Sequence, residues 1–171
     1  MARRPRGIPV YFCSEINEKN IKELLDEISE KLNLRPNVRV VLYLTSPGGD
    51  PQAGLHFAYV ARFLHLPLVT CAVSEVASAA VYVYLAGRRR LALPDAYFYF
   101  HNMKANIESA MELKEWEQRI SRFKFFEEKK RKFLADASGI SQEKIDQLCN
   151  ENRLMEPEEA LKLGIVHKII G

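Results

Sequence analysis

The stretch VVLYLTSPGGDPQAG, residues 40–54, carries the strongest local signal for the fold. Its first part belongs to a β-rich run, Asn37–Leu44, which is typical of a strand. Ser46-Pro47-Gly48-Gly49 then breaks the chain. Asp50 is a preferred N-cap residue and Pro51 suits the first helical position, so a helix is expected to begin here. Strand, glycine turn and helix in this order predict an α/β unit.

The same alternation continues on both sides of this unit. Short β-rich runs predict further strands at 8–12, 67–73, 91–93, 96–100 and 165–170. Helical spacing and cap residues predict helices at 21–32, 78–86 and 107–137, and two more that begin at 141 and 157. Strands that alternate with helices predict an α/β fold with crossover connections. No linker rich in Pro, Gly or Ser divides the chain, so residues 1–171 are expected to form a single domain.

Composition and charge exclude several classes of protein. With 171 residues, 47% hydrophobic and 27% charged, the chain matches a water-soluble globular domain and not a fibre or a disordered protein. The most apolar stretch, Val76–Leu85, is too short to span a bilayer, so no membrane contact is expected. The 25 basic and 22 acidic residues are mixed along the chain, and the net charge of +3 requires no nucleic-acid partner. The start of the chain lacks the apolar run of a secretory signal, which favours a cytoplasmic location.

Cysteine and histidine spacing gives no support for a disulfide framework or a metal site. Cys13, Cys71 and Cys149 lie far apart, and buried reduced thiols are the favoured interpretation. His56 and His65 are not in metal-ligand spacing either. We therefore expect neither a metal nor a cofactor.

Three segments contain residue types suited to catalysis, and each also has an ordinary structural interpretation. The glycines of Ser46–Asp50 let the backbone approach a ligand closely and offer N–H groups to an anion, although a plain tight turn uses the same residues. Ser78 lies where a strand gives way to an apolar helix, a position that suits a nucleophile near a helix N-terminus or a simple N-cap. His101 ends the run Ala96–Phe100 and is either a general base or a core histidine.

Taken together, these segments resemble the proteolytic subunit of the Clp protease, the ClpP family of serine peptidases. The resemblance rests on residues 43–54, on Ala77-Ser78-Ala79 and on Ala92-Leu93-Pro94-Asp95 ahead of His101, in that order and spacing. Residues 158–166 are similar to the C-terminal segment of the family. The resemblance implies a ClpP/crotonase-like α/β fold of repeated β-β-α units with a long helical handle.

The resemblance also implies the roles of individual residues. Ser78 corresponds to the nucleophile and His101 to the general base that deprotonates it. The backbone N–H groups of Gly49 and Ala79 correspond to the donors that hold the oxyanion. These roles agree with general chemistry, because a serine needs a base within hydrogen-bond reach and the developing charge needs preorganised donors. The implied reaction is hydrolysis of a peptide bond.

Position 152 departs from the family, because Asn152 stands where an aspartate is expected. An amide oxygen can accept a hydrogen bond from His101, but it carries no charge to stabilise the imidazolium. In a chymotrypsin-type triad the change from aspartate to asparagine costs about 10⁴ in kcat. The sequence therefore predicts an attenuated peptidase with a Ser78-His101-Asn152 triad, with Glu151 and Asp146 as alternative carboxylates.

The family resemblance further implies the partners. Its members enclose their active sites in a homo-oligomeric ring and act on peptides or unfolded proteins, so both are expected here. The segment from His101 to Glu108 lacks the glycines of the family's substrate-binding strand. Only a short segment precedes Ile8, where the family has a longer axial loop. Docking of an ATP-dependent unfoldase is therefore not assumed.

Two rival functions stay open at the level of sequence. One is a catalytically inactive ring partner, for which Asn152 would be the mark of lost activity. The other is an acyl-CoA enzyme of the crotonase superfamily, which shares the fold and the oxyanion cradle. A hydratase has no need of Ser78 and His101 at protease spacing, which favours the peptidase.

Overall fold

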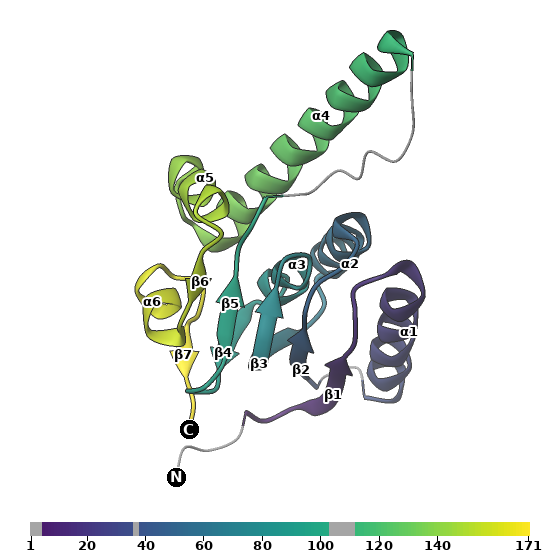
Figure 1. The fold of residues 1–171 in the computed structure, drawn as a ribbon. Helices are drawn as coiled ribbons and strands as arrows, with labels where there is room; N and C mark the ends of the chain where they lie inside the picture. The colour runs from purple at the N-terminus through teal and green to yellow at the C-terminus, as the bar shows by residue number, and fades with distance from the viewer. Residues whose placement is uncertain (1–4, 36–37, 103–111) are drawn as a thin grey trace.

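Strands and helices alternate along the chain in the computed structural model, which describes residues 5–35, 38–102 and 112–171 (Figure 1). The elements, in chain order, are β1 (Ile8–Cys13), α1 (Glu18–Leu34), β2 (Val40–Ser46), α2 (Pro51–Phe63), β3 (Leu68–Ala77), α3 (Ala80–Leu85), β4 (Arg89–Ala92), β5 (Tyr97–Tyr99), α4 (Leu113–Ser138), α5 (Gln142–Asn150), β6 (Leu154–Met155), α6 (Pro157–Lys162) and β7 (Lys168–Ile169). This α/β architecture agrees with the fold class that the sequence predicts.

Strand β3 lies at the centre of the sheet and pairs with three other strands. The sheet has the order β1-β2-β3-β4-β7, and all of these pairs are parallel. On the side away from β2, residues 69–72 of β3 pair with β4, whereas residues 75–77 pair with β5. Strand β5 also pairs with β6 in the antiparallel sense. The second half of β3 therefore leads to a different neighbour from the first.

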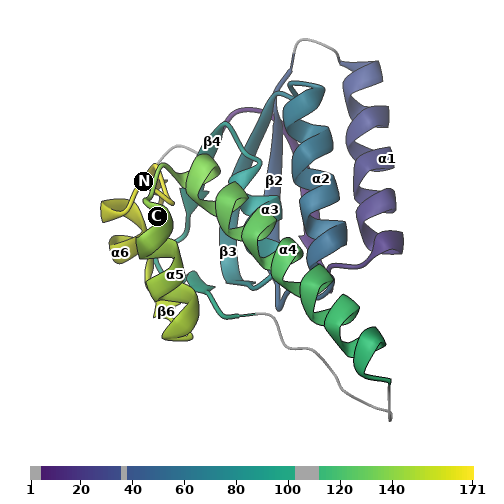
Figure 2. The ribbon, with the colours of Figure 1, turned by 90° about the horizontal axis from the view of Figure 1, so that it is seen from above.

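The main core lies between the sheet and the helices on one of its faces. Figure 2 shows α1, α2 and α3 along that face. The alternation of β2 sends Val40, Leu42 and Leu44 into this core. Val41 instead joins a small apolar cluster of the opposite face, against which Tyr43 packs. The period-2 pattern of the strand thus separates a large core from a small one.

Helix α3 is buried on all sides, as its all-apolar sequence predicts. Tyr84 anchors it to the sheet: its hydroxyl donates to the carbonyl of Leu91 at 3.0 Å, and its backbone carbonyl accepts from the Thr70 hydroxyl at 2.8 Å. The helix begins at Ala80, two residues later than expected. Strand β3 correspondingly continues to Ala77, beyond the expected end at Val73.

Helix α4 is the long handle that the sequence predicts, and its two halves have different surroundings. Its buried residues all come from the C-terminal part, from Lys130 to Ser138. Leu113, Ile120 and Phe125 are exposed in the part that projects from the sheet in Figure 1. The expected helix start near residue 107 lies outside the described residues. None of the helices in the described ranges combines the length and apolar composition that a membrane crossing needs.

A short strand and one cysteine also differ from the sequence-based predictions. The antiparallel strand β6 is absent from the prediction, because a two-residue strand has no period of its own and exists only through its pairing with β5. Cys71 and Cys149 are buried reduced thiols as expected, and burial raises the pKa of Cys71 to about 11. Cys13 is exposed, so the prediction of a buried thiol is wrong there. It lies at the end of the edge strand β1, where the alternation turns it to solvent.

A buried cation ties the C-terminal ends of two helices together. Arg90 is 7% exposed, and its guanidinium donates to the carbonyls of Ile165 at 2.7 Å, Gly164 at 2.8 Å and Ala137 at 3.2 Å. Ala137 lies in the last turn of α4, and Gly164 follows α6. Arg90 therefore satisfies carbonyls that these helix ends leave without a partner of their own.

We expect Arg90→Ala to lower the free energy of unfolding by about 3 kcal/mol, because one buried and two partly buried carbonyls lose a charged donor. Urea unfolding measures this change. Arg89→Ala is the matched control, since Arg89 is the preceding residue of the same strand and is exposed; its effect should stay within about 0.5 kcal/mol. Equal losses in the two variants would contradict the role assigned to Arg90.

Candidate active site

Three loops meet where parallel strands end, and they bring together residues that are far apart in sequence. Strand β2 ends at Ser46, β3 at Ala77 and β5 at Tyr99, and these strands are neighbours in the sheet. Ligands of open α/β sheets bind beyond the carboxyl ends of the strands. The segments that carry Gly49, Ser78 and His101 begin at this edge.

The turn after β2 is held by a hydrogen bond within the turn and by others to Ile16, which follows β1. Gly48 and Gly49 have φ angles of 96° and 138°, a region that residues with a Cβ rarely adopt. The Gly48 N–H donates to the Ser46 hydroxyl at 3.1 Å, and the Gly48 carbonyl accepts from the N–H of Ile16 at 2.7 Å. Within the described residues, the N–H of Gly49 donates to no protein acceptor. It is therefore available to a ligand.

Ser78 adopts a left-handed backbone conformation between β3 and α3, with φ of 52°. Its N–H donates to the carbonyl of Tyr99 at 2.9 Å, which ties the residue to the end of β5. The N-cap position of α3 belongs to Ala79, and no side chain caps this helix. The alternative interpretation of Ser78 as an N-cap is therefore wrong. Strained residues of this kind cluster at functional sites.

Ser78 and His101 line the same cavity, which has a volume of about 310 Å³. The other lining residues come from the turn after β2, from α2 and from α4: Gly49, Asp50, Pro51, Gln52, Leu55, Phe126 and Lys130. Ala79 follows Ser78 directly, and its N–H has no acceptor in the part of the chain that the structure describes. The structure thus brings four of the five predicted site residues to one place.

His101 has a defined orientation. Its Nδ1 lies 2.6 Å from the backbone carbonyl oxygen of Asn102, and its ring packs against Tyr99 with 5.3 Å between the ring centroids. Among the described contacts, no hydrogen bond joins its imidazole to the Ser78 hydroxyl. The imidazole is thus held on its Nδ1 side, while Nε2 has no described partner.

Asn152 is the predicted site residue that the structure does not bring to His101. It is exposed in a turn after α5 with φ of 49°, and it does not line the cavity. No described hydrogen bond joins its side chain to the imidazole. Of the two alternative carboxylates, Asp146 accepts from Arg131 at 2.7 Å and Glu151 accepts from Gln147 at 2.7 Å. Neither contacts His101 in the described contacts.

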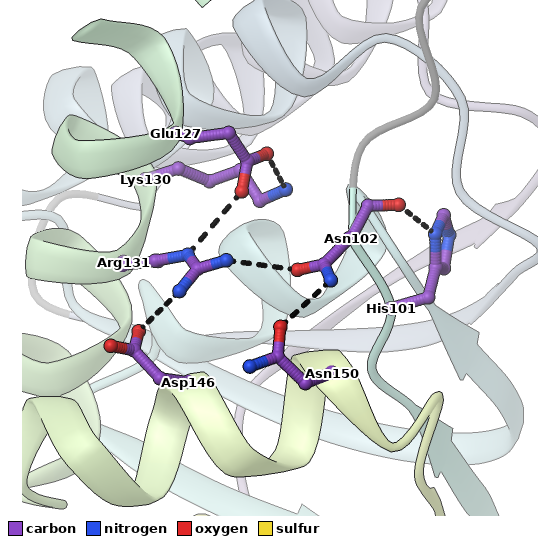
Figure 3. A network of polar contacts seen from close by, with 7 residues as sticks. All are labelled: His101, Asn102, Glu127, Lys130, Arg131, Asp146 and Asn150. Atoms are coloured by element: carbon purple, nitrogen blue, oxygen red, sulfur yellow. Dashed lines mark hydrogen bonds and ion pairs between the residues drawn. The ribbon is translucent and has the colours of Figure 1, made fainter. Parts of the chain in front are cut away.

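A polar network beside His101 contains residues that sequence reasoning missed (Figure 3). The Arg131 guanidinium connects the Asn102 side chain with Asp146 and Glu127. Lys130 donates to the other Glu127 oxygen at 2.8 Å and is 5% exposed. One signal was present in the sequence: Lys130 lies four residues after Phe126 and three before Phe133, so it interrupts an apolar helix face.

Metal chemistry has no visible ligand set at this site. In the described ranges, no group of three or more His, Cys, Asp and Glu side chains lies close enough to hold a metal ion. The polar side chains that line the cavity carry a hydroxyl, an imidazole, an ammonium, one carboxylate and one amide, from Ser78, His101, Lys130, Asp50 and Gln52. This set is suited to acid-base and nucleophilic chemistry.

Comparison with protein-family models matches residues 6–171 to the family described as Clp protease. The chain belongs to the Clp protease family. It is similar to the ATP-dependent Clp protease proteolytic subunit 2 of Treponema denticola, with 24% identity over 94% of this chain and 80% of that protein. The proteins of the same name from Pseudomonas aeruginosa and Treponema pallidum are each 26% identical, over 94% and 99% of this chain and 80% and 90% of theirs.

Membership of the Clp protease family relates the cavity to the chemistry of serine peptidases. The match covers every described strand and helix, including the three loops at the cavity. The family is one of serine peptidases, which need a nucleophile, a base and oxyanion donors in one place. The chain is therefore a Clp-protease-like peptidase homologue, and the roles of its individual residues are taken up below.

The close contact between the glycine turn and Ser78 leads to a testable prediction. A Cβ at Gly48 would lie 2.7 Å from the Ser78 Cβ and 2.7 Å from the Ala77 carbonyl oxygen. We expect Gly48→Ala to lower the free energy of unfolding by about 2 to 4 kcal/mol, because steric overlap adds to backbone strain. Urea unfolding measures the loss.

Gly139→Ala is the control for backbone strain alone. Gly139 also has a positive φ, 78°, but a Cβ there would meet nothing within 4 Å. We expect a loss of about 1 kcal/mol, the usual cost of placing alanine in this conformation. Equal losses for the two variants would show that the contact between Gly48 and Ser78 has no energetic weight.

Proposed function

We propose that this protein is a serine endopeptidase in which Ser78 is the nucleophile and His101 the general base. The observation that carries the proposal is the meeting of Ser78 and His101 in one cavity beside the glycine turn. Gly49 lines the same cavity. Membership of the Clp protease family supports the assignment independently of this geometry.

The proposed reaction gives a role to each of these groups. The Ser78 hydroxyl attacks the carbonyl carbon of a peptide bond while Nε2 of His101 takes its proton. The N–H groups of Gly49 and Ala79 stabilise the negative oxygen of the tetrahedral intermediate. His101 then gives the proton to the leaving amine, and an acyl-enzyme remains on Ser78. Water, deprotonated by His101, releases the acyl group and restores the serine.

The third position of the triad stays a prediction. We propose Asn152 for it on its alignment with the aspartate of the family, and an asparagine there predicts attenuated activity. Its exposed place in the turn after α5 gives it no contact with His101 in the present conformation. The Asn102 carbonyl, which does contact Nδ1, is a rival for the orienting role.

We further propose that the protein acts as a homo-oligomeric ring on peptides or unfolded proteins. The projecting half of α4 supports this, because Leu113 is 76% exposed, Phe125 55% and Ile120 48%. Apolar side chains gathered on one projecting element favour burial against another protein. The relatives are named as ATP-dependent proteolytic subunits, so an ATP-dependent unfoldase is a candidate partner here too. A cytoplasmic location stays part of this proposal.

One observation favours a second candidate, a catalytically inactive ring partner. In the described contacts His101 is bonded to Asn102 and not to Ser78, and no carboxylate reaches its ring. If Ser78 and His101 do not form a hydrogen bond, the serine is not activated. The protein would then still assemble into the oligomer but would not hydrolyse peptides. Labelling of the serine distinguishes the two candidates.

We expect a fluorophosphonate probe to label the wild-type protein on Ser78 and not to label Ser78→Ala. Intact-mass spectrometry measures labelling in each assembly state separated by size. Ser74→Ala is the matched control, because Ser74 is an exposed serine of β3, the strand that ends just before Ser78, and it should label like wild type. If wild type is unlabelled in every assembly state, the inactive ring partner is the correct interpretation.

We expect Asn152→Asp to raise the rate of peptide hydrolysis by at least about tenfold if Asn152 occupies the third triad position, because a carboxylate stabilises the imidazolium. Hydrolysis of a fluorogenic peptide measures the rate. Asn33→Asp adds the same charge at an exposed position of α1 and should leave the rate unchanged. No gain in Asn152→Asp would remove Asn152 from the proposed triad.

A further inference from the structure

The hydrogen bond between His101 and Asn102 assigns the tautomer of the histidine. A backbone carbonyl only accepts hydrogen bonds, so at 2.6 Å the proton must be on Nδ1. In the neutral ring, Nε2 then keeps its lone pair. This is the protonation state that a general base for serine requires. The tautomer therefore depends on where the Asn102 carbonyl is held.

The side chain of Asn102 is fixed from two helices. Its Oδ1 accepts from a terminal nitrogen of Arg131 in α4 at 3.0 Å, and its Nδ2 donates to Oδ1 of Asn150 in α5 at 2.9 Å. An amide whose acceptor and donor are both engaged cannot rotate freely. The backbone of Asn102, and with it the carbonyl, is thus restrained by contacts outside its own loop.

Arg131 is itself held in place, so it can act as a rigid support. Its side chain is 21% exposed, and it donates to Asp146 at 2.7 Å and to Glu127 at 3.3 Å. Glu127 in turn accepts from Lys130. A guanidinium presents its donors in a fixed plane, and three acceptors from different segments define its position. Among the described residues of this network, two cations are paired with two carboxylates.

We propose that Arg131, acting through Asn102, is a positioning residue for His101 and holds the imidazole with its proton on Nδ1. The inference rests on the proposed function, because it concerns the base of that reaction. The Asn102 carbonyl fixes the tautomer and direction of the ring but supplies no negative charge. Arg131 touches neither the substrate nor the reacting atoms, so its effect passes through His101 alone.

Nitrogen-15 NMR of the histidine rings tests the hydrogen bond without any activity measurement. At a pH where His101 is neutral, we expect Nδ1 to carry the proton in wild type, with His101→Gln used to assign the signal. Asn102→Ala and Arg131→Met should shift the ring toward the Nε2–H tautomer that free histidine favours in water. An Nε2–H tautomer in wild type, or no change in both variants, would overturn the proposal.

Labelling kinetics of Ser78 test the consequence for reactivity. We expect Arg131→Met to lower the maximal labelling rate, kinact, by about 10²-fold, the size of effect that a misplaced catalytic group produces, with KI within about twofold of wild type. Arg131→Lys and Asn102→Asp keep part of the contact and should recover part of the rate. Arg122→Met is the matched control on an exposed turn of α4 and should label like wild type.

The outcomes separate this inference from the proposed function. If wild type labels on Ser78 and Arg131→Met labels equally fast, the peptidase assignment stands and the role of Arg131 is refuted. If Asn152→Ala loses labelling while Arg131→Met keeps it, Asn152 is the orienting residue. If wild type does not label at all, the proposed function fails, and the positioning role fails with it whatever the NMR shows.

Discussion

The pairing of β3 with β4 and then with β5 is the constraint on which the rest of the site depends. One strand can satisfy two successive neighbours on the same side only if the first ends where the second begins. Because β2, β3 and β5 are parallel to one another, their carboxyl ends meet at the same edge of the sheet. The segments that follow these strands contribute Gly49, Ser78 and His101 to one cavity, which α2 and α4 also line. The register of β3 with β2 and β5 therefore determines that Ser78 and His101 lie close together.

Backbone strain at Ser78 is maintained by its neighbours on both sides. A left-handed serine costs free energy and persists only where the surroundings leave it no alternative. The hydrogen bond from its N–H to the Tyr99 carbonyl ties it to β5, and Gly48 lies so close that a Cβ there would be 2.7 Å from the Ser78 Cβ. The same two contacts fix the backbone of the residue that the proposed reaction uses as its nucleophile. Stability and chemistry are therefore coupled at this position.

Helix α4 combines two physical roles in one element. Its projecting half exposes apolar side chains, whereas its other half buries Phe133 and Leu134 in the core. Where the two halves meet, Arg131 and its carboxylates link the helix to the loop of His101 (Figure 3). Such a link gives contacts along the handle a physical route to the base of the proposed reaction. A charged network at this boundary is tolerated because its cations and carboxylates are paired.

The sequence by itself determined the order of strands and helices, the glycine turn and the segments of Ser78 and His101. These follow from periodicity, caps and turn residues, which act over a few neighbouring positions. Only the tertiary structure decided the ending of β3 at Ala77, the existence of β6 and the partner of His101 Nδ1. Asn102 meets Arg131 across 29 residues and Asn150 across 48, and no local pattern encodes such contacts. They arise only when the sheet and the handle are packed together, because that packing alone fixes the distance between the loop after β5 and helices α4 and α5.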